Sequence, residues 1–430
     1  MAAGSGNGLL YAGSFDPNEL VVKSENIFYN NCIARNGYRT GFHLENPANY
    51  PTFNVNYMNC VCEDCGRARE YFQGGEWDTY AMGFVLHSGT TMIGCKSIRN
   101  RRTGIYCAYG GTIRDSYVEG YTNGSINDLY GLRVDGIYKT KCNVIVDGCT
   151  FSNIRGIGVS LSQTSGAKIV NNYFHNIGMD GSNRYAIAFA DATTGGATVD
   201  NNIIYMDTNA GAAALAIYIN GNNHIITNNK IFYSPGYGIY ALTGRDITIA
   251  NNLVTDCNAT AITTATKYDK YTIIGNRIYN INSTGINLRG SDNLVSNNLI
   301  YDTNGVAIIE TAGVNRNVIT NNNVSGETIT VVGANSIVNG NVGYATPYYS
   351  SQGMYVGWIS GSKSKITTAD PALVLYDYET RAHIIELTDA RIPQKSHNGA
   401  VMFFNGETGR LEIYRPDLGV FTDILGNEVD

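Results

Sequence analysis

Short stretches in which apolar and polar residues alternate recur along most of the chain. The second and fourth residues of each stretch are mostly apolar, and most stretches open on Gly or Ala, as in Gly-Ile-Tyr-Cys-Ala from Gly104. Successive side chains of a β-strand point to opposite faces, so each stretch predicts a short strand with one buried face and one solvent face. The stretches begin at residues 41, 83, 104, 131, 156, 186, 216, 238, 261, 285, 306 and 328.

A second repeat, built on Asn, sets the spacing of these strands. Asn pairs recur before apolar residues, and once Asn276 and Asn322 fill the series, the second Asn of successive coils lie 22 to 30 residues apart. This period is typical of a solenoid. Asn tolerates the left-handed backbone of a tight corner, and stacked Asn side chains can hydrogen-bond from coil to coil. Earlier coils carry a ladder of small residues instead, at Cys32, Cys60, Cys95, Ser116 and Cys149. The Asn series is Asn172, Asn202, Asn229, Asn252, Asn276, Asn298 and Asn322.

These two repeats predict an all-β protein, a right-handed single-stranded parallel β-helix (a solenoid of about a dozen coils) over residues 1–345. The repeat stops at Asn341-Val342. Residues 346–430 are expected to form a small β-rich C-terminal module, because two apolar-aromatic runs around Asn-Gly-Glu-Thr-Gly predict a hairpin over Gly399–Tyr414.

Composition narrows the classes of function. Charged residues make up 15% of the chain and the net charge is -6, which argues against a nucleic-acid partner. No apolar run is long enough for membrane insertion, and the N-terminus lacks the pattern of a secretory signal. Nine Cys, an odd number, favour free thiols over a disulfide framework. Cys60, Cys62 and Cys65 lack a second half with metal-ligand spacing, so no metal and no cofactor is expected.

The alternation also predicts which side chains line one outer strip of the helix. Its first four coils concentrate charge and imidazole, the next two carry little side chain, and two Tyr coils follow. This zoning favours a glycan-binding groove, and a solvated face with chance variation is the alternative. The expected outward pairs are His43/Glu45, Val85/His87, Tyr106/Ala108, Arg133/Asp135, Gly158/Ser160, Ala188/Ala190, Tyr218/Asn220, Tyr240/Leu242, Thr263/Ala265, Asn287/Arg289 and Ile308/Glu310.

The chemistry of the strip fits an acidic polysaccharide, which needs a cation at its carboxylate and a base at the C5 proton. A glycosidase needs two carboxyl groups about 5–9.5 Å apart, but Glu45 and Asp135 are expected three coils, or about 14 Å, apart. Hydrolysis would therefore need a loop acid such as Asp115, Glu119 or Asp191. Candidate catalytic residues are Glu45, His87, Arg133 and Asp135, and candidate substrate-binding residues are His43, Tyr106, Asp191, Tyr218, Asn220 and Tyr240.

The Asn-rich coils of residues 20–342 resemble the pectate-lyase-like β-helix superfamily, which includes polysaccharide lyases, hydrolases, epimerases and bacteriophage tailspikes. The segment from Ser14 to Glu45 is similar to the catalytic stretch of mannuronan C5-epimerases: Phe15-Asp16-Pro17 matches a Tyr-Gly-Phe-Asp-Pro-His motif, and Glu45 matches a later acid. The motif His is replaced by Asn18 and the Tyr by Gly13. This resemblance adds Asp16 to the expected substrate-binding residues.

The C-terminal segment from Gly399 to Gly426 resembles a short module at the ends of phage tail and fibre proteins. The resemblance implies a trimeric tailspike on a virion, in which residues 346–430 cap or oligomerise the chain. We therefore expect a tail appendage that binds, and degrades by a lyase-like or hydrolytic reaction, an extracellular or capsular polysaccharide at the host surface, alongside other tail proteins. The alternatives are a non-enzymatic fibre or adhesin, and a free-standing extracellular lyase or C5-epimerase.

Overall fold

The computed structural model describes most of the repeat region and five short strands of the C-terminal part. All structural statements below concern these residues. They are 9–11, 27–37, 40–44, 55–66, 82–86, 89–107, 110–120, 130–135, 143–179, 184–192, 194–206, 214–266, 270–325, 327–333, 335–343, 375–377, 382–384, 401–405, 410–415 and 420–423.

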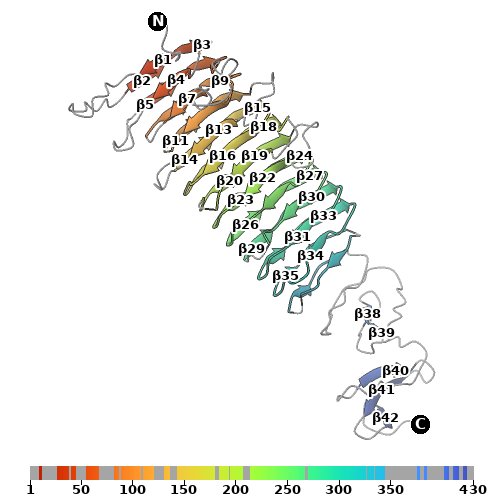
Figure 1. Ribbon diagram of the computed structural model, residues 1–430. Coiled ribbons are helices and arrows are strands. Elements are labelled where there is room, and N and C mark those ends of the chain that lie inside the picture. The colour runs from red at the N-terminus through yellow and green to blue at the C-terminus, as the bar shows by residue number, and fades with distance from the viewer. Residues whose placement is uncertain are drawn as a thin grey trace.

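The repeat region is a parallel β-helix whose coils stack in chain order (Figure 1). Each full coil contributes one strand to each of three parallel sheets, called A, B and C. Sheet B runs from β2 (Ile27–Asn30) to β37 (Ile337–Asn339), and sheet C from β3 (Ile33–Arg35) to β33 (Leu299–Thr303). Sheet A consists of β1 (Leu9–Tyr11), β4 (Phe42–Leu44), β7 (Met82–Leu86), β10 (Thr103–Cys107), β13 (Tyr130–Asp135), β16 (Ile157–Ser162), β19 (Tyr185–Phe189), β22 (Leu215–Ile219), β25 (Ile239–Ala241), β28 (Ile262–Thr263), β31 (Ile286–Leu288), β34 (Ile308–Glu310) and β36 (Ile329–Thr330).

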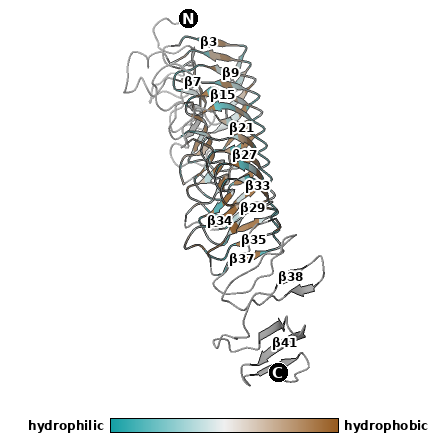
Figure 2. Cartoon of the chain, turned by 90° about the vertical axis from the view of Figure 1, so that its right-hand side faces the viewer, coloured by the Kyte–Doolittle hydropathy of each residue, from teal (hydrophilic) through white to brown (hydrophobic). Residues whose placement is uncertain are grey.

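The predicted β-helix is therefore confirmed. Inward residues of all three sheets form one continuous apolar core, in which Ile is the commonest residue, followed by Val and Ala. Hydrophobic segments recur from coil to coil down the stack (Figure 2). Aromatic residues stack in the N-terminal coils, where the Phe42 and Phe84 rings lie 4.8 Å apart. No helix among the described residues is long and apolar enough to cross a membrane.

The Asn repeat forms the predicted corner between sheets B and C. All eleven turns from a sheet B strand to the next sheet C strand have two residues. The first residue is left-handed, as at Asn251, where φ is 56°, and the second points inward. Asn252 is buried; its Oδ1 accepts from both the backbone N–H and the Nδ2 of Asn229, at 3.0 Å each, and its own Nδ2 donates to Asn276 Oδ1.

The predicted ladder of small residues continues these corners toward the N-terminus. The Cys60 N–H points to Cys95 Sγ at 3.4 Å, the Cys95 N–H donates to Ser116 Oγ, and the Cys149 N–H donates to Asn172 Oδ1 at 2.9 Å. In both ladders, a backbone N–H at the corner points to the side chain at the same corner of the following coil.

Two coils depart from the expected register. Arg133 pairs with Ser160 rather than Gly158, because the stretch from Gly156 begins two residues before its counterpart in the preceding coil. Asn287 pairs with Ile309, so Ile308 and Glu310, expected to face solvent, are buried instead.

Glu310 is a carboxylate in a core position near the C-terminal end of the helix. Its oxygens accept hydrogen bonds from Asn317 Nδ2 at 2.8 Å and from the backbone N–H groups of Val332 and Gly333 at 3.1 and 2.8 Å. These three donors compensate its burial, so Glu310 binds the last coils to one another.

The hairpin expected over Gly399–Tyr414 is present as β40 (Val401–Asn405) and β41 (Arg410–Arg415), which pair antiparallel. A third strand, β42 (Val420–Asp423), extends this sheet, and β38 (Leu375–Asp377) pairs with β39 (Ala382–Ile384).

Asn252→Ala is expected to lower the free energy of unfolding by about 3 kcal/mol, because it leaves buried donors and acceptors of both neighbouring coils without hydrogen-bond partners. Asn251→Gly is the matched control: the exposed corner position already holds Gly in other coils, at Gly148 and Gly275, so a change below about 1 kcal/mol is expected. Urea denaturation of both variants measures the difference. Equal losses would show that the amide ladder does not hold the coils.

Candidate functional site

The outer face of sheet A carries one row of side chains in strict register, which we call the sheet A row. Parallel pairing places each member beside the next along eleven strands. Ten strand spacings of about 4.8 Å make the row about 48 Å long. Its members are His43, Val85, Tyr106, Arg133, Ser160, Ala188, Tyr218, Tyr240, Thr263, Asn287 and Ile309.

The turns on both sides of sheet A vary in length, in contrast to the fixed corners between sheets B and C. The chain takes ten residues between β4 and β5 (Val55–Met58), and eighteen between β6 (Val61–Glu63) and β7. It takes ten between β12 (Tyr117–Glu119) and β13, and eight between β13 and β14 (Val144–Asp147). Insertions therefore gather around one face, which is where loops of a rigid scaffold place binding and catalytic residues.

The expected Tyr coils lie on this face, but their rings stack on one another. Tyr185 and Tyr218 have ring centroids 4.7 Å apart with planes 18° from parallel, and Tyr218 and Tyr240 have centroids 6.2 Å apart at 14°. The ring faces are directed along the stack rather than outward, so we expect ring edges and hydroxyls, not flat shelves, to meet a ligand. Burial, and then the neighbouring Tyr185 and Tyr240, raises the pKa of Tyr218 to about 12, so its hydroxyl stays a donor at neutral pH.

Several positions of the sheet A row are buried although they point away from the core. They include Val85, Ser160, Ala188 and Thr263. The last two are short side chains beside taller ones, Ala188 next to Tyr218 and Thr263 between Tyr240 and Asn287. Ala265, also expected to face solvent, is buried as well. The coils expected to carry little side chain in the middle of the strip are therefore shielded from solvent.

Of the residues predicted as catalytic or substrate-binding, Asp16, Glu45 and His87 lie outside the described residues. His43, Arg133 and Asp135 lie on described strands, and their side chains are outside the description. Pairing still brings part of the predicted set into one row. Tyr106 neighbours Arg133, and Tyr218 neighbours Tyr240, while His43 lies two strands from Tyr106.

Asp191 and Asn220, predicted to bind substrate, lie in turns between sheets A and B. Asp191 Oδ2 accepts the Ser162 hydroxyl and the Gln163 N–H, and its Oδ1 accepts the Thr194 N–H at 3.2 Å. Asn220 is largely buried, and its Oδ1 accepts the Thr243 hydroxyl. Both side chains tie one turn to a neighbouring segment, which fixes the rim of the sheet A face.

His224, just before β23 (Ile225–Thr227), was not singled out by the sequence. Its ring stacks on Phe189 at 4.4 Å, and its Nδ1 accepts the Ala197 N–H at 3.2 Å. Burial lowers its pKa to about 4, so the imidazole is neutral at pH 7. Asn293 holds the corresponding place before β32 (Leu294–Ser296) and accepts the Tyr271 N–H. We therefore read His224 as a structural acceptor.

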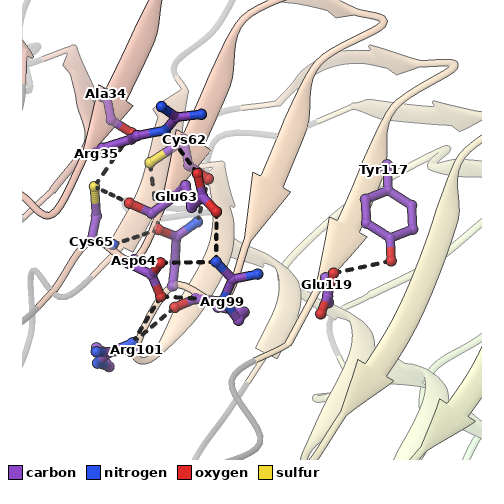
Figure 3. A network of polar contacts seen from close by, with 11 residues as sticks. Ala34, Arg35, Cys62, Glu63, Asp64, Cys65, Arg99, Arg101, Tyr117 and Glu119 are labelled. Carbon is purple, nitrogen blue, oxygen red and sulfur yellow. Dashed lines mark hydrogen bonds and ion pairs between the residues drawn. The ribbon is translucent and has the colours of Figure 1, made fainter.

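A charged network, also unexpected from the sequence, joins the first coils at the C-terminal ends of their sheet C strands (Figure 3). Glu63 lies between Arg35 at 2.8 Å and Arg99 at 2.5 Å, and Asp64 contacts Arg99 at 2.9 Å and Arg101 at 3.5 Å. The hydrogen bonds that Arg99 donates to Asp64 and Glu63 raise the pKa of its guanidinium. These charges are paired with each other across coils, so the network holds the coils in register.

The part of the chain that the structure describes holds no group of three or more His, Cys, Asp or Glu side chains arranged to bind a metal.

These features define a β-solenoid with long insertions around one face, and a family profile matches the solenoid. The profile of the family described as "Right handed beta helix region" matches residues 83–216 and 215–357, so the chain belongs to that family. No curated protein matches its sequence.

Among solved structures, the chain is similar to the Dettilon tailspike protein (gp208), with 14% identity and a TM-score of 0.49 over 69% of this chain and 62% of that one. It is similar to tailspike protein 3 of bacteriophage CBA120, with 10% identity and a TM-score of 0.43 over 94% and 65%. It is also similar to the A-module of the mannuronan C-5 epimerase AlgE6 of Azotobacter vinelandii, with 13% identity and a TM-score of 0.42 over 75% and 92%. The chain thus spans under two thirds of either tailspike.

Stability is expected to depend on pH through His224. Because burial lowers its pKa from 6.5 to about 4, its contribution is complete above pH 6.5 and is lost as the pH falls toward 4, by up to roughly 3 kcal/mol. His224→Asn, which keeps an acceptor, should flatten this pH dependence. Unfolding free energies between pH 7.5 and 4 test it, and an unchanged slope in the variant would contradict it.

Proposed function

We propose that the protein binds a polysaccharide along the outer face of sheet A. The observation that carries this proposal is the collection of variable turns around that one face, while the opposite corner keeps two residues in every coil. A row about 48 Å long with a repeating strand spacing suits an extended polymer better than a small molecule. Phenolic hydroxyls of the tyrosine stack (Tyr185, Tyr218 and Tyr240) supply hydrogen-bond donors to sugar oxygens.

We further propose that this face degrades the polymer, by a lyase-like or hydrolytic reaction. His87 and Glu45 are the candidate bases, Arg133 the candidate partner of a sugar carboxylate, and Asp135 the candidate acid; His43, Tyr106 and Asp16 would bind the substrate. The support is that Arg133 adjoins Tyr106 in the sheet A row, and that β4, β7 and β13 are each bordered by an insertion of ten residues or more.

The resemblance of the C-terminal segment to the ends of phage fibres leads us to propose a virion tail appendage, assembled as a homotrimer and acting at the host cell surface. A non-enzymatic fibre or adhesin, and a free-standing extracellular lyase or epimerase, are the competing functions. A fibre predicts glycan binding without products, and an epimerase predicts an altered sugar ratio without chain cleavage.

Binding is tested on an array of bacterial capsular and extracellular polysaccharides. Tyr218→Phe keeps the ring stack and removes one hydroxyl, so it should weaken binding about fivefold, equivalent to one hydrogen bond of about 1 kcal/mol. Tyr279→Phe, in the stacked pair with Tyr301 on sheet C, is the matched control and should change nothing. Equal effects, or no binding to any glycan, would overturn the proposed site.

The same incubations test the reaction, because a lyase product absorbs at about 235 nm and hydrolysis releases reducing ends. If a glycan is bound and neither signal appears, the proposed binding stands and the proposed reaction is refuted.

The proposed trimer predicts a mass of three times 46.7 kDa, about 140 kDa. Sedimentation equilibrium measures this directly, and a monomer mass at micromolar concentration would refute it.

A further inference from the structure

Arg289 directly follows β31 and is a cation on the sheet A face. Few interactions fix its guanidinium in place. Its Nη1 donates to the Tyr240 hydroxyl at 3.3 Å, and the described residues offer its guanidinium no ion pair and no other hydrogen bond. A guanidinium carries five N–H donors in a planar fork. Most of this donor capacity is therefore unused, and a single long hydrogen bond is a weak anchor.

Two polar atoms without partners lie beside this cation. Thr263 Oγ1 and Asn287 Oδ1 are shielded from solvent and have no hydrogen bond. Thr263 pairs with Tyr240 on one side and with Asn287 on the other, so the contact between Arg289 and Tyr240 spans the coil of Thr263. A buried polar group without a hydrogen bond is destabilising, and a ligand that carries hydroxyls can supply the missing bonds.

Arg277, from the same coil but on sheet C, shows what a structural arginine looks like in this protein. Its Nη2 donates to the Tyr301 hydroxyl at 2.8 Å, and its guanidinium lies over the rings of Tyr279 and Tyr301, at 5.2 and 5.8 Å from their centroids. The same pair of residue types is tightly associated on sheet C and loosely associated on sheet A. The difference points to a ligand at Arg289.

We propose that Tyr240, Thr263, Asn287 and Arg289 form a subsite for a sugar that carries a carboxylate, so that the polysaccharide bound by the sheet A face is acidic. A carboxylate accepts two parallel hydrogen bonds from a guanidinium, and the Tyr240 hydroxyl can donate a third. Ring hydroxyls of the same sugar donate to Asn287 Oδ1 and exchange hydrogen bonds with the Thr263 hydroxyl. This proposal rests on the proposed glycan-binding function and names its class of substrate.

The subsite is separate from the candidate catalytic residues. Arg133 lies on β13 and Asn287 on β31, with five sheet A strands between them. At about 4.8 Å per strand the separation is about 29 Å. Arg289 is therefore expected to affect binding of a long chain rather than the reacting sugar.

The test uses the full chain on an array that holds acidic polysaccharides, the same polysaccharides after chemical reduction of their carboxyl groups, and neutral ones. The variants are R289M, R289K and the matched control R277M, which removes the same charge and a Tyr hydrogen bond on sheet C. Thermal melts confirm that each variant is folded. R289K keeps the charge and loses the fork, so it remains informative if R289M is unstable.

We expect wild-type protein to retain glycans that carry carboxylates and to lose them on carboxyl reduction. R289M should weaken retention about tenfold or more and R289K less, with binding that falls as salt rises, while R277M stays at the wild-type level. Retention of a glycan that survives carboxyl reduction, or equal retention by R289M, would overturn this subsite and leave the proposed function standing. Absence of binding to every glycan would overturn both.

Discussion

The inward amide at the corner between sheets B and C is the interaction on which the rest of the structure depends. At this corner the chain turns from sheet B into sheet C within two residues, and the backbone N–H of the second corner residue cannot join a regular ladder of strand bonds. The Asn Oδ1 of the following coil accepts that N–H together with an amide N–H, as Asn276 does for Asn252 at 2.9 and 3.0 Å. One side chain per coil thus satisfies buried donors that would otherwise cost free energy.

A corner held in this way cannot change length, and this constraint determines where the protein can vary. An insertion between sheets B and C would break the amide stack in two neighbouring coils. Insertions beside sheet A break no such stack, and the chain there takes from two to eighteen residues. The face opposite the rigid corner is consequently the one that can acquire new side chains, which links the structural ladder to the location of the proposed site.

The periodic features of this fold could be predicted from sequence because they are repeated. Asn252 and its equivalents recur at nearly constant spacing, and the inward apolar positions alternate. The prediction failed where a coil lacks that contrast. Around Gly158 and Ser160 small residues fill every second position, so the register is ambiguous by two. At Glu310 an acid occupies a core position and is compensated by donors from Asn317, Val332 and Gly333, which no alternation rule anticipates.

The site is less predictable, because its properties depend on distances between coils. The sequence places Tyr218 and Tyr240 on one face, but only their coordinates show that the rings stack on each other. Arg289 and Tyr240 are 49 residues apart, and Arg277 and Tyr301 are 24 apart. The sequence does not distinguish the two pairs, because each consists of an arginine and a tyrosine in or near predicted strands. The 2.8 Å bond with two ring contacts on sheet C satisfies one guanidinium, whereas the 3.3 Å bond beside two unpaired oxygens on sheet A does not satisfy the other. The hydrogen-bonding capacity left unused around Arg289, rather than its residue type, is therefore what distinguishes it from Arg277.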